Sequence, residues 1–189
     1  MKKIAFLAAA TCAVLATPAM AQNVTGTINL SGSVAAKCTV TGTTPGSTFA
    51  QAVAFGELAQ SNGTLRTGLD TDFTAAAVQA TVVCNTGTPK ISVDANALVL
   101  TPSAAAPTGY ANTINYTASV AVSTATPATV NFSNATTAAA GSPTAVGAAL
   151  ANTPNNIKVT ATGFATPAAS DILMAGSYSG NIVIVISPA

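Results

Sequence analysis

Residues 23–34 read Asn-Val-Thr-Gly-Thr-Ile-Asn-Leu-Ser-Gly-Ser-Val, so apolar residues or glycine alternate with polar residues at every step. This period of two is typical of a β-strand that buries one face. The run is about twice as long as a usual strand of roughly 5–6 residues. It either pairs inside its own domain as an ordinary first strand or is donated to a neighbouring subunit. The apolar face consists of Val24, Gly26, Ile28, Leu30, Gly32 and Val34.

A secretory signal peptide, residues 1–21, is predicted ahead of this stretch. Lys2 and Lys3 give a positively charged start, an apolar run follows over 4–16, and small residues precede a cleavage site after Ala21. The apolar run is too short to span a bilayer, and no later stretch is long and apolar enough for a membrane helix. We therefore expect an exported protein, with a signal in the bacterial style.

The mature chain, residues 22–189, has the size of one ordinary domain and is large enough for a real core. Two of the six basic residues lie in the leader, which leaves four against five acidic residues. This balance offers no attraction to nucleic acid or to an anionic membrane. Only 6% of the chain is charged, against roughly 25% in a typical soluble domain. Such a surface repels its neighbours weakly, so crowding into an assembly would cost little.

Two cysteines, Cys38 and Cys84, remain after cleavage of the leader. An even pair in an exported chain predicts a disulfide, and two free buried thiols are the alternative. Closing the loop between these residues should stabilise the fold by about 4 kcal/mol in the chain-entropy model.

Further strand patterns follow along the chain and are separated by turns rich in Gly, Pro, Asn and Ser. No convincing amphipathic helix interrupts them, and residues 133–156 lack a clean period, which predicts a long loop with at most one short strand. The total of about seven or eight strands predicts an all-β fold, an immunoglobulin-like antiparallel β-sandwich. The chain has no Trp, so the core should be aliphatic. Residues 53–58 form a short apolar segment before a turn. The predicted strands are 34–41, 73–84, 90–100, 110–122 and 156–164, a final one within 176–187, and a shorter piece at 130–132.

The final strand contains Ile182-Val183-Ile184-Val185-Ile186, which is β-branched on both faces. A strand of this kind is expected deep in a sheet and not at a solvent edge. The chain stops three residues later, at Ala189, and no hairpin partner follows. We therefore expect another segment to cover the free edge of this strand.

Residues for catalysis or metal binding are almost absent. The chain has no His, which removes the commonest general base and the usual zinc ligand. Glu57 is the only Glu, and Asp70-Thr71-Asp72 lacks the Gly and the distal Glu of a calcium loop. That pair of carboxylates either holds a cation or lies in a plain solvated turn, and the second is expected. We predict no catalytic, cofactor-binding or metal-binding residue, no cofactor and no enzymatic activity.

The chain resembles subunits of archaic chaperone–usher pili, which are grouped with the spore coat protein U domain. The resemblance covers both ends and the cysteine frame, while 102–156 is not matched. The residues that carry it are Val24-Thr25-Gly26-Thr27-Ile28, Lys37-Cys38-Thr39-Val40, Phe55-Gly56-Glu57-Leu58, Ala80-Thr81-Val82-Val83-Cys84 and Ala175-Gly176-Ser177-Tyr178-Ser179-Gly180-Asn181.

The resemblance implies an immunoglobulin-like sandwich that lacks its last strand. A periplasmic chaperone fills the gap first, and the N-terminal extension of the next subunit replaces it at an outer-membrane usher, by strand addition to an open sheet edge. It implies a donor-strand extension over 22–35 and a pilin-like domain over 36–189. The acceptor-groove edge would then carry Ile182, Ile184 and Ile186.

Together these observations predict a structural subunit of a bacterial surface pilus or fibre, with a part in adhesion or biofilm formation. Its partners would be identical or related subunits, the chaperone and the usher, and not nucleic acid. It would pass through the periplasm to the cell surface. The alternative is a self-contained secreted β-sandwich, a coat, matrix or ligand-binding protein, whose long first strand closes its own fold.

Overall fold

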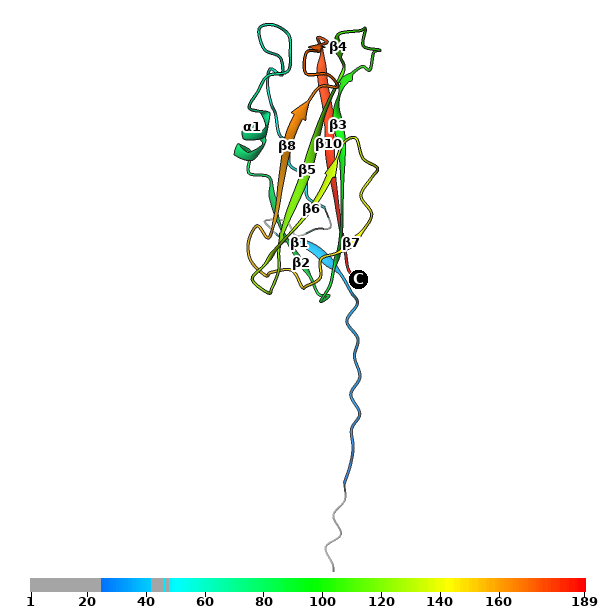
Figure 1. The fold of residues 1–189 in the computed structure, drawn as a ribbon. Coiled ribbons are helices and arrows are strands. Elements are labelled where there is room, and N and C mark those ends of the chain that lie inside the picture. Colours follow the sequence, from blue (N-terminus) through cyan, green and yellow to red (C-terminus); the bar gives the residue numbers. More distant parts are fainter. Residues whose placement is uncertain (1–24, 42–45, 47) are drawn as a thin grey trace, which may run out of the picture. The chain divides into compact units, whose positions relative to one another are not determined.

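The computed structural model describes residues 25–41, 46 and 48–189 (Figure 1). The predicted signal peptide, Asn23 and Val24 lie outside these residues. The chain divides into two units, 1–34 and 35–189, and every helix and strand of the described residues belongs to the second unit.

The second unit is built almost entirely from strands, which confirms the predicted all-β class. One helix of seven residues, α1, interrupts them. The elements are β1 (Cys38–Thr41), α1 (Leu69–Ala75), β2 (Gln79–Cys84), β3 (Lys90–Thr101), β4 (Tyr110–Ala111), β5 (Thr113–Ser123), β6 (Thr129–Ala135), β7 (Thr144–Ala145), β8 (Ile157–Ala165), β9 (Ile172–Leu173) and β10 (Ser177–Ser187).

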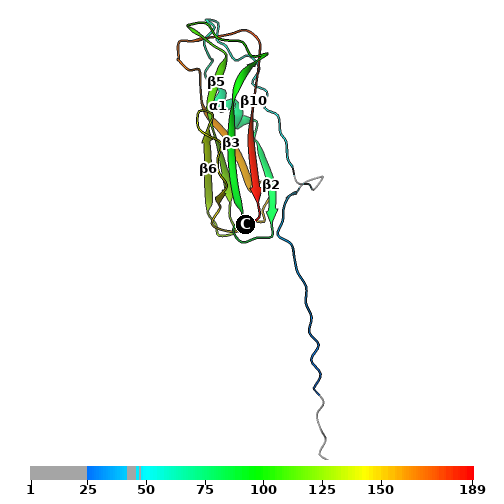
Figure 2. The ribbon, with the colours of Figure 1, turned by 90° about the vertical axis from the view of Figure 1, so that its right-hand side faces the viewer.

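Eight strands form one antiparallel sheet with the order β1-β2-β8-β5-β3-β10. β6 is added to β5, and β7 is added to β3. The start of β5 pairs with β3, while the rest of β5 lies between β8 and β6. The long strands β3, β5 and β10 run along a common direction (Figure 2). A separate pair, β4 and β9, is parallel.

β5 supplies the centre of the core. Its residues alternate between buried and half-buried along the whole strand, as the period of two predicts. The core is aliphatic apart from a few aromatic rings, as expected for a chain without Trp. The fully buried side chains of the core include Ile114, Ala118, Val120, Val122, Ile157 and Ala161.

Asn156 is buried in this apolar core and all of its side-chain bonds go to the backbone. Its Oδ1 accepts the Val82 N–H at 2.8 Å, and its Nδ2 donates to the carbonyls of Val82 and Ala151, each at 2.7 Å. The amide therefore makes the hydrogen bonds to the backbone of β2 that a neighbouring strand would make. A buried polar group satisfied in this way adds stability instead of a desolvation cost.

The predicted strand over 73–84 is wrong in its first part, because Phe73 lies in α1 and β2 begins only at Gln79. The helix starts after Gly68, whose φ of 89° suits glycine. Leu69 and Phe73 are four residues apart, so both face the core and are buried. A helix this short depends on tertiary packing, which the alternation of neighbouring residues does not reveal.

The predicted strand over 110–122 is also corrected at its start. Tyr110 was expected within this strand, but it lies in β4 and is 45% exposed. β4 pairs with β9, a two-residue strand that the sequence did not indicate. Among the described residues, the end of β6 and the short strand β7 lie within 133–156.

Candidate functional site

The final strand, β10, has one open edge. It pairs with β3 over its whole length, and no other described strand pairs with it. The prediction that Ile182–Ile186 lies deep in a sheet is therefore wrong for the single chain. Val183 and Val185 are 41% and 53% exposed, while the isoleucines of the other face are half-buried against the core.

A groove follows the open edge of β10. It consists of three adjoining cavities of about 320, 440 and 730 Å³. The first two share Ile182 and Ile184, and the last two share Phe55 and Gly180, so the three are continuous. We call this feature the β10 groove. It brings together the three predicted residues of the acceptor edge, Ile182, Ile184 and Ile186, with Cys38 and Val40 of β1.

The opposite wall of the β10 groove is formed by β1 and by residues 48–59. Phe49, Val53 and Phe55 of this segment are half-buried and pack against the core. β1 and β10 are the two end strands of the sheet order, and both line the same cavity. The sheet is therefore nearly closed, and its gap lies between these two strands.

Aromatic side chains meet under the middle of the groove. The ring of Phe164 lies 5.3 Å from that of Phe55 and 5.1 Å from that of Tyr116, centroid to centroid. The Tyr116 hydroxyl lies 2.9 Å from the Asn96 carbonyl oxygen and 3.2 Å from that of Asn181, so it can donate to either. Burial, with a smaller effect of the Asp94 carboxylate, raises the pKa of Tyr116 to about 12. The hydroxyl is therefore neutral at physiological pH and links β5 to the edge of β10.

Gly180 interrupts the straight edge of β10. The register with β3 shifts between Ser179 and Asn181, which marks a β-bulge. A Cβ at Gly180 would lie 2.6 Å from the carbonyl oxygen of Ala97, a distance that side chains do not tolerate. The regular part of the open edge therefore runs from Asn181 to the end of the strand at Ser187.

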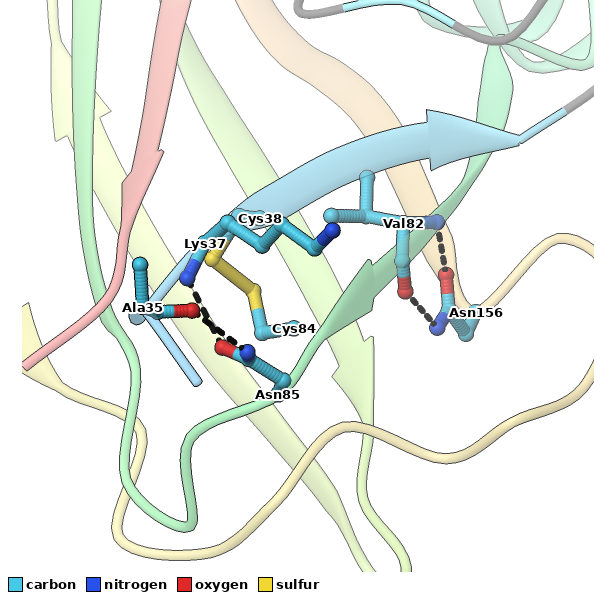
Figure 3. The surroundings of a disulfide bond; sticks show 7 residues. All are labelled: Ala35, Lys37, Cys38, Val82, Cys84, Asn85 and Asn156. Carbon is cyan, nitrogen blue, oxygen red and sulfur yellow. Dashed lines mark hydrogen bonds between the residues drawn. A yellow bond between two sulfur atoms is a disulfide. The ribbon is translucent and has the colours of Figure 1, made fainter. Parts of the chain in front are cut away.

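The disulfide between Cys38 and Cys84 is present, which confirms the predicted bond (Figure 3). It joins directly opposed residues of β1 and β2 and closes a loop with a sequence separation of 46. β1 has only four residues and forms one wall of the groove. The disulfide therefore fixes a short strand that would hold weakly by its backbone bonds alone.

The predicted donor residues Gly26, Ile28, Leu30, Gly32 and Val34 lie in the first unit, and Val24 lies outside the described residues. The described stretch 25–34 has no strand in this single chain. Its large apolar side chains are more than four-fifths exposed, with Ile28 at 86%, Leu30 at 92% and Val34 at 85%. The alternating face is thus unpartnered in the described chain.

Most of the groove's lining could not be recognised from residue patterns. Phe49, Val53, Phe55, Tyr116 and Phe164 contribute to it. The short apolar segment at 53–58 was the available signal, but an apolar segment before a turn does not by itself indicate a groove wall.

Asp70 and Asp72 were expected in a solvated turn, but both lie on α1. Asp72 forms an ion pair with Arg66, and Asp70 accepts the Gly163 N–H at 3.1 Å. These carboxylates therefore have structural partners. Within the described residues, no three His, Cys, Asp or Glu side chains gather as metal ligands would, and no helix is long and apolar enough to cross a membrane.

No match to this chain is found among models of protein families, curated proteins or solved structures.

Proposed function

We propose that this protein is a structural subunit of a bacterial surface pilus or fibre. In this proposal residues 23–34 of one copy insert into the β10 groove of the next copy. The observation that carries the proposal is the pairing of an open, apolar sheet edge with an exposed, alternating stretch in the same chain. Each half supplies what the other lacks, namely a strand for the edge and an apolar cover for the alternating face.

The donor stretch is long enough to cover the open edge. At roughly 3.3 Å per residue, the stretch 25–34 spans about 33 Å as a strand, and the regular part of the edge, from Asn181 to Ser187, spans about 23 Å. The donor stretch and the groove are also nearly free of charge. Residues 23–34 carry none, and among the described residues that line the groove only Glu57 is charged and its side chain is exposed. Insertion beside Ile182–Ile186 would therefore bury no charge.

Burial of the donor side chains supplies the binding free energy. Ile28, Leu30 and Val34 each contribute roughly 1.5–3 kcal/mol when they move from full exposure into an apolar groove. Backbone hydrogen bonds to β10 set the register, because a slip of one residue turns every apolar side chain outward. Gly26 and Gly32 would lie where the groove is shallow.

The inserted strand would fill the gap between β1 and β10 and close the sheet. We infer that the subunit is an immunoglobulin-like sandwich without its last strand, in line with the resemblance to archaic chaperone–usher subunits. A newly exported chain would then need a periplasmic chaperone to cover the same edge, and an outer-membrane usher to exchange that chaperone for the next subunit. The assembled fibre would lie at the cell surface, with a part in adhesion or biofilm formation.

The test places a charge on either face of the donor stretch. The proposal predicts that the wild type gives a ladder of denaturant-resistant oligomers in gel electrophoresis. Ile28→Asp puts a carboxylate into the apolar groove and should abolish that ladder. Asn29→Asp puts the same charge on the polar face and should leave the ladder intact. Circular dichroism should show the same thermal unfolding for both subunits, because the domain does not use this strand.

Deletion of Asn23–Ser33 distinguishes the proposal from the self-contained alternative. The proposal predicts a folded, exported subunit that joins no fibre. If the deletion instead unfolds the domain, the stretch is an internal strand and the protein is a closed secreted module.

A further inference from the structure

We propose that Asn85 holds the start of the domain so that the donor stretch cannot fill its own β10 groove and stays available to a second copy. This inference rests on the proposed function and names a residue that selects between the two possible acceptors, the subunit's own groove and that of its neighbour.

Asn85 binds the backbone of Ala35 and Lys37, two of the three residues that precede β1 (Figure 3). Its Oδ1 accepts the Lys37 N–H at 2.7 Å, and its Nδ2 donates to the Ala35 carbonyl at 2.8 Å. Its own N–H donates to the Lys37 carbonyl at 3.1 Å. Because Cys38 already pairs with Cys84, these bonds continue the β1–β2 pairing back to Ala35. Residues 35–37 are thereby held along the line of β1.

The chain enters the domain at the end of the groove where β10 finishes. Cys38 lies opposite Cys84, a short loop leads from Cys84 to Lys90, and Lys90 lies opposite Ser187. A donor stretch that returned to its own groove would therefore have to reverse direction immediately before Cys38. It would then run parallel to β10 and form a hairpin with β1.

The residues needed for that reversal are the ones that Asn85 holds. With 35–37 extended along β2, the turn would have to fall within 31–34. Gly32 and Val34 would then be lost from the inserted face, and only the part up to Leu30 could reach the groove. A donor stretch from a second copy has no such restriction and can insert its whole apolar face. The side chain of Asn85 thus favours exchange between copies over closure of a single copy.

Both the acceptor and the donor of the Asn85 amide are required to hold residues 35–37 in place. An aspartate would keep an acceptor for the Lys37 N–H but could not donate to Ala35, and an alanine would lose both bonds. If the contact only stabilised the domain, its loss would lower the stability of the domain without changing which donor stretch occupies the groove. The experiment therefore measures whether the groove of a monomer is open.

The probe is a fluorescent synthetic peptide of residues 23–34, added to full-length monomers that are diluted below the concentration at which they assemble. Asn85→Ala should capture the peptide roughly fivefold less than the wild type, because losing two hydrogen bonds releases the turn and lets the protein's own donor stretch compete. In an Ile28→Asp background the protein's own donor stretch cannot compete, so adding Asn85→Ala should leave capture unchanged. Asn62→Ala is the matched control, since it removes two hydrogen bonds to Thr64 in an exposed turn, and it should behave as the wild type.

Equal capture by the wild type and by Asn85→Ala would overturn the inference. An equal loss of capture in the Ile28→Asp background would also overturn it, because the change would then have damaged the groove itself. If Ile28→Asp monomers do not capture the peptide at all, the proposed function fails, independently of what Asn85 does. A peptide carrying Ile28→Asp serves as the blank.

Discussion

β5 and β10 are strands of the same length, and in both, apart from the bulge in β10, more buried residues alternate with more exposed ones, yet they have different surroundings. β5 lies between β8 and β6, and its alternate residues Ala118, Val120 and Val122 are fully buried. β10 has β3 on one side only, and its isoleucines remain half-buried beside the groove. The views in Figures 1 and 2 show both strands running the length of the domain.

The periodicity of side-chain burial and the pairing of the backbone are therefore separate properties of a strand. The periodicity determines which side chains face the core, and it is present in both strands. The number of neighbours decides how completely those side chains are covered and whether the backbone edge is satisfied. β10 is thus a core strand that lacks one neighbour, which is the basis of the proposed function.

The largest expected effect comes from placing a charge in each strand. Val120→Asp buries a carboxylate without a partner and should destabilise the domain by more than about 4 kcal/mol, which amounts to loss of folding. Ile184→Asp should cost only about 2 kcal/mol, because its carboxylate can reach solvent through the open groove, and yet it should abolish assembly. Urea unfolding followed by circular dichroism, together with the oligomer ladder, measures both.

Val185→Asp is the control for this pair, since it introduces the same charge on the exposed face of β10. It should retain both the fold and the ladder. If Ile184→Asp unfolded the domain as fully as Val120→Asp, β10 would be as complete a core strand as β5, and the groove would have no need of an added strand.

The next effect concerns the wall that faces β10. Cys38→Ser should destabilise the domain by about 4 kcal/mol, because the unfolded chain regains the freedom that the disulfide removes. This is a large share of the total stability of an ordinary domain, so the yield of folded protein should fall sharply. Urea unfolding with and without reductant measures the loss. The double variant Cys38→Ser, Cys84→Ser should be no less stable than the single one, and two free thiols found by alkylation of the wild type would contradict the expectation.

The smallest effect tests the hydrogen bond that links β5 to β10. The raised pKa of Tyr116 means that folding favours the neutral hydroxyl. The contribution of this hydroxyl to the free energy of unfolding is therefore complete below pH 10 and is lost as the pH rises from 10 towards 12. This loss should be on the order of 1 kcal/mol, because the groove is open to solvent, which weakens the effect of burial. Melting temperatures between pH 9 and 11.5 should fall less steeply for Tyr116→Phe than for the wild type.

A second tyrosine contributes to the alkaline loss of stability. Burial also raises the pKa of Tyr178, so some of this loss should persist in Tyr116→Phe. An unchanged slope in Tyr116→Phe would show that its hydroxyl does not link the two strands.

The sequence by itself determined the all-β class, the disulfide and most of the long strands. The period of two placed β3, β5, β8 and β10 within a few residues of their observed bounds, because alternation is a local consequence of strand geometry. The cysteine count predicted the bond between Cys38 and Cys84 for an equally simple reason, since an even pair in an exported chain is expected to be oxidised.

Only the tertiary structure decided which elements neighbour one another. Helix α1 forms because Leu69 and Phe73 find a core to pack against, and residues 48–59 become a groove wall without regular secondary structure. The residues of β10 predicted a strand that needs cover on both faces, but a strand's side chains do not encode how many strands pair with its backbone. Strand neighbours are distant in sequence, so periodicity determines the face that is buried, and packing alone determines the edge that is left open.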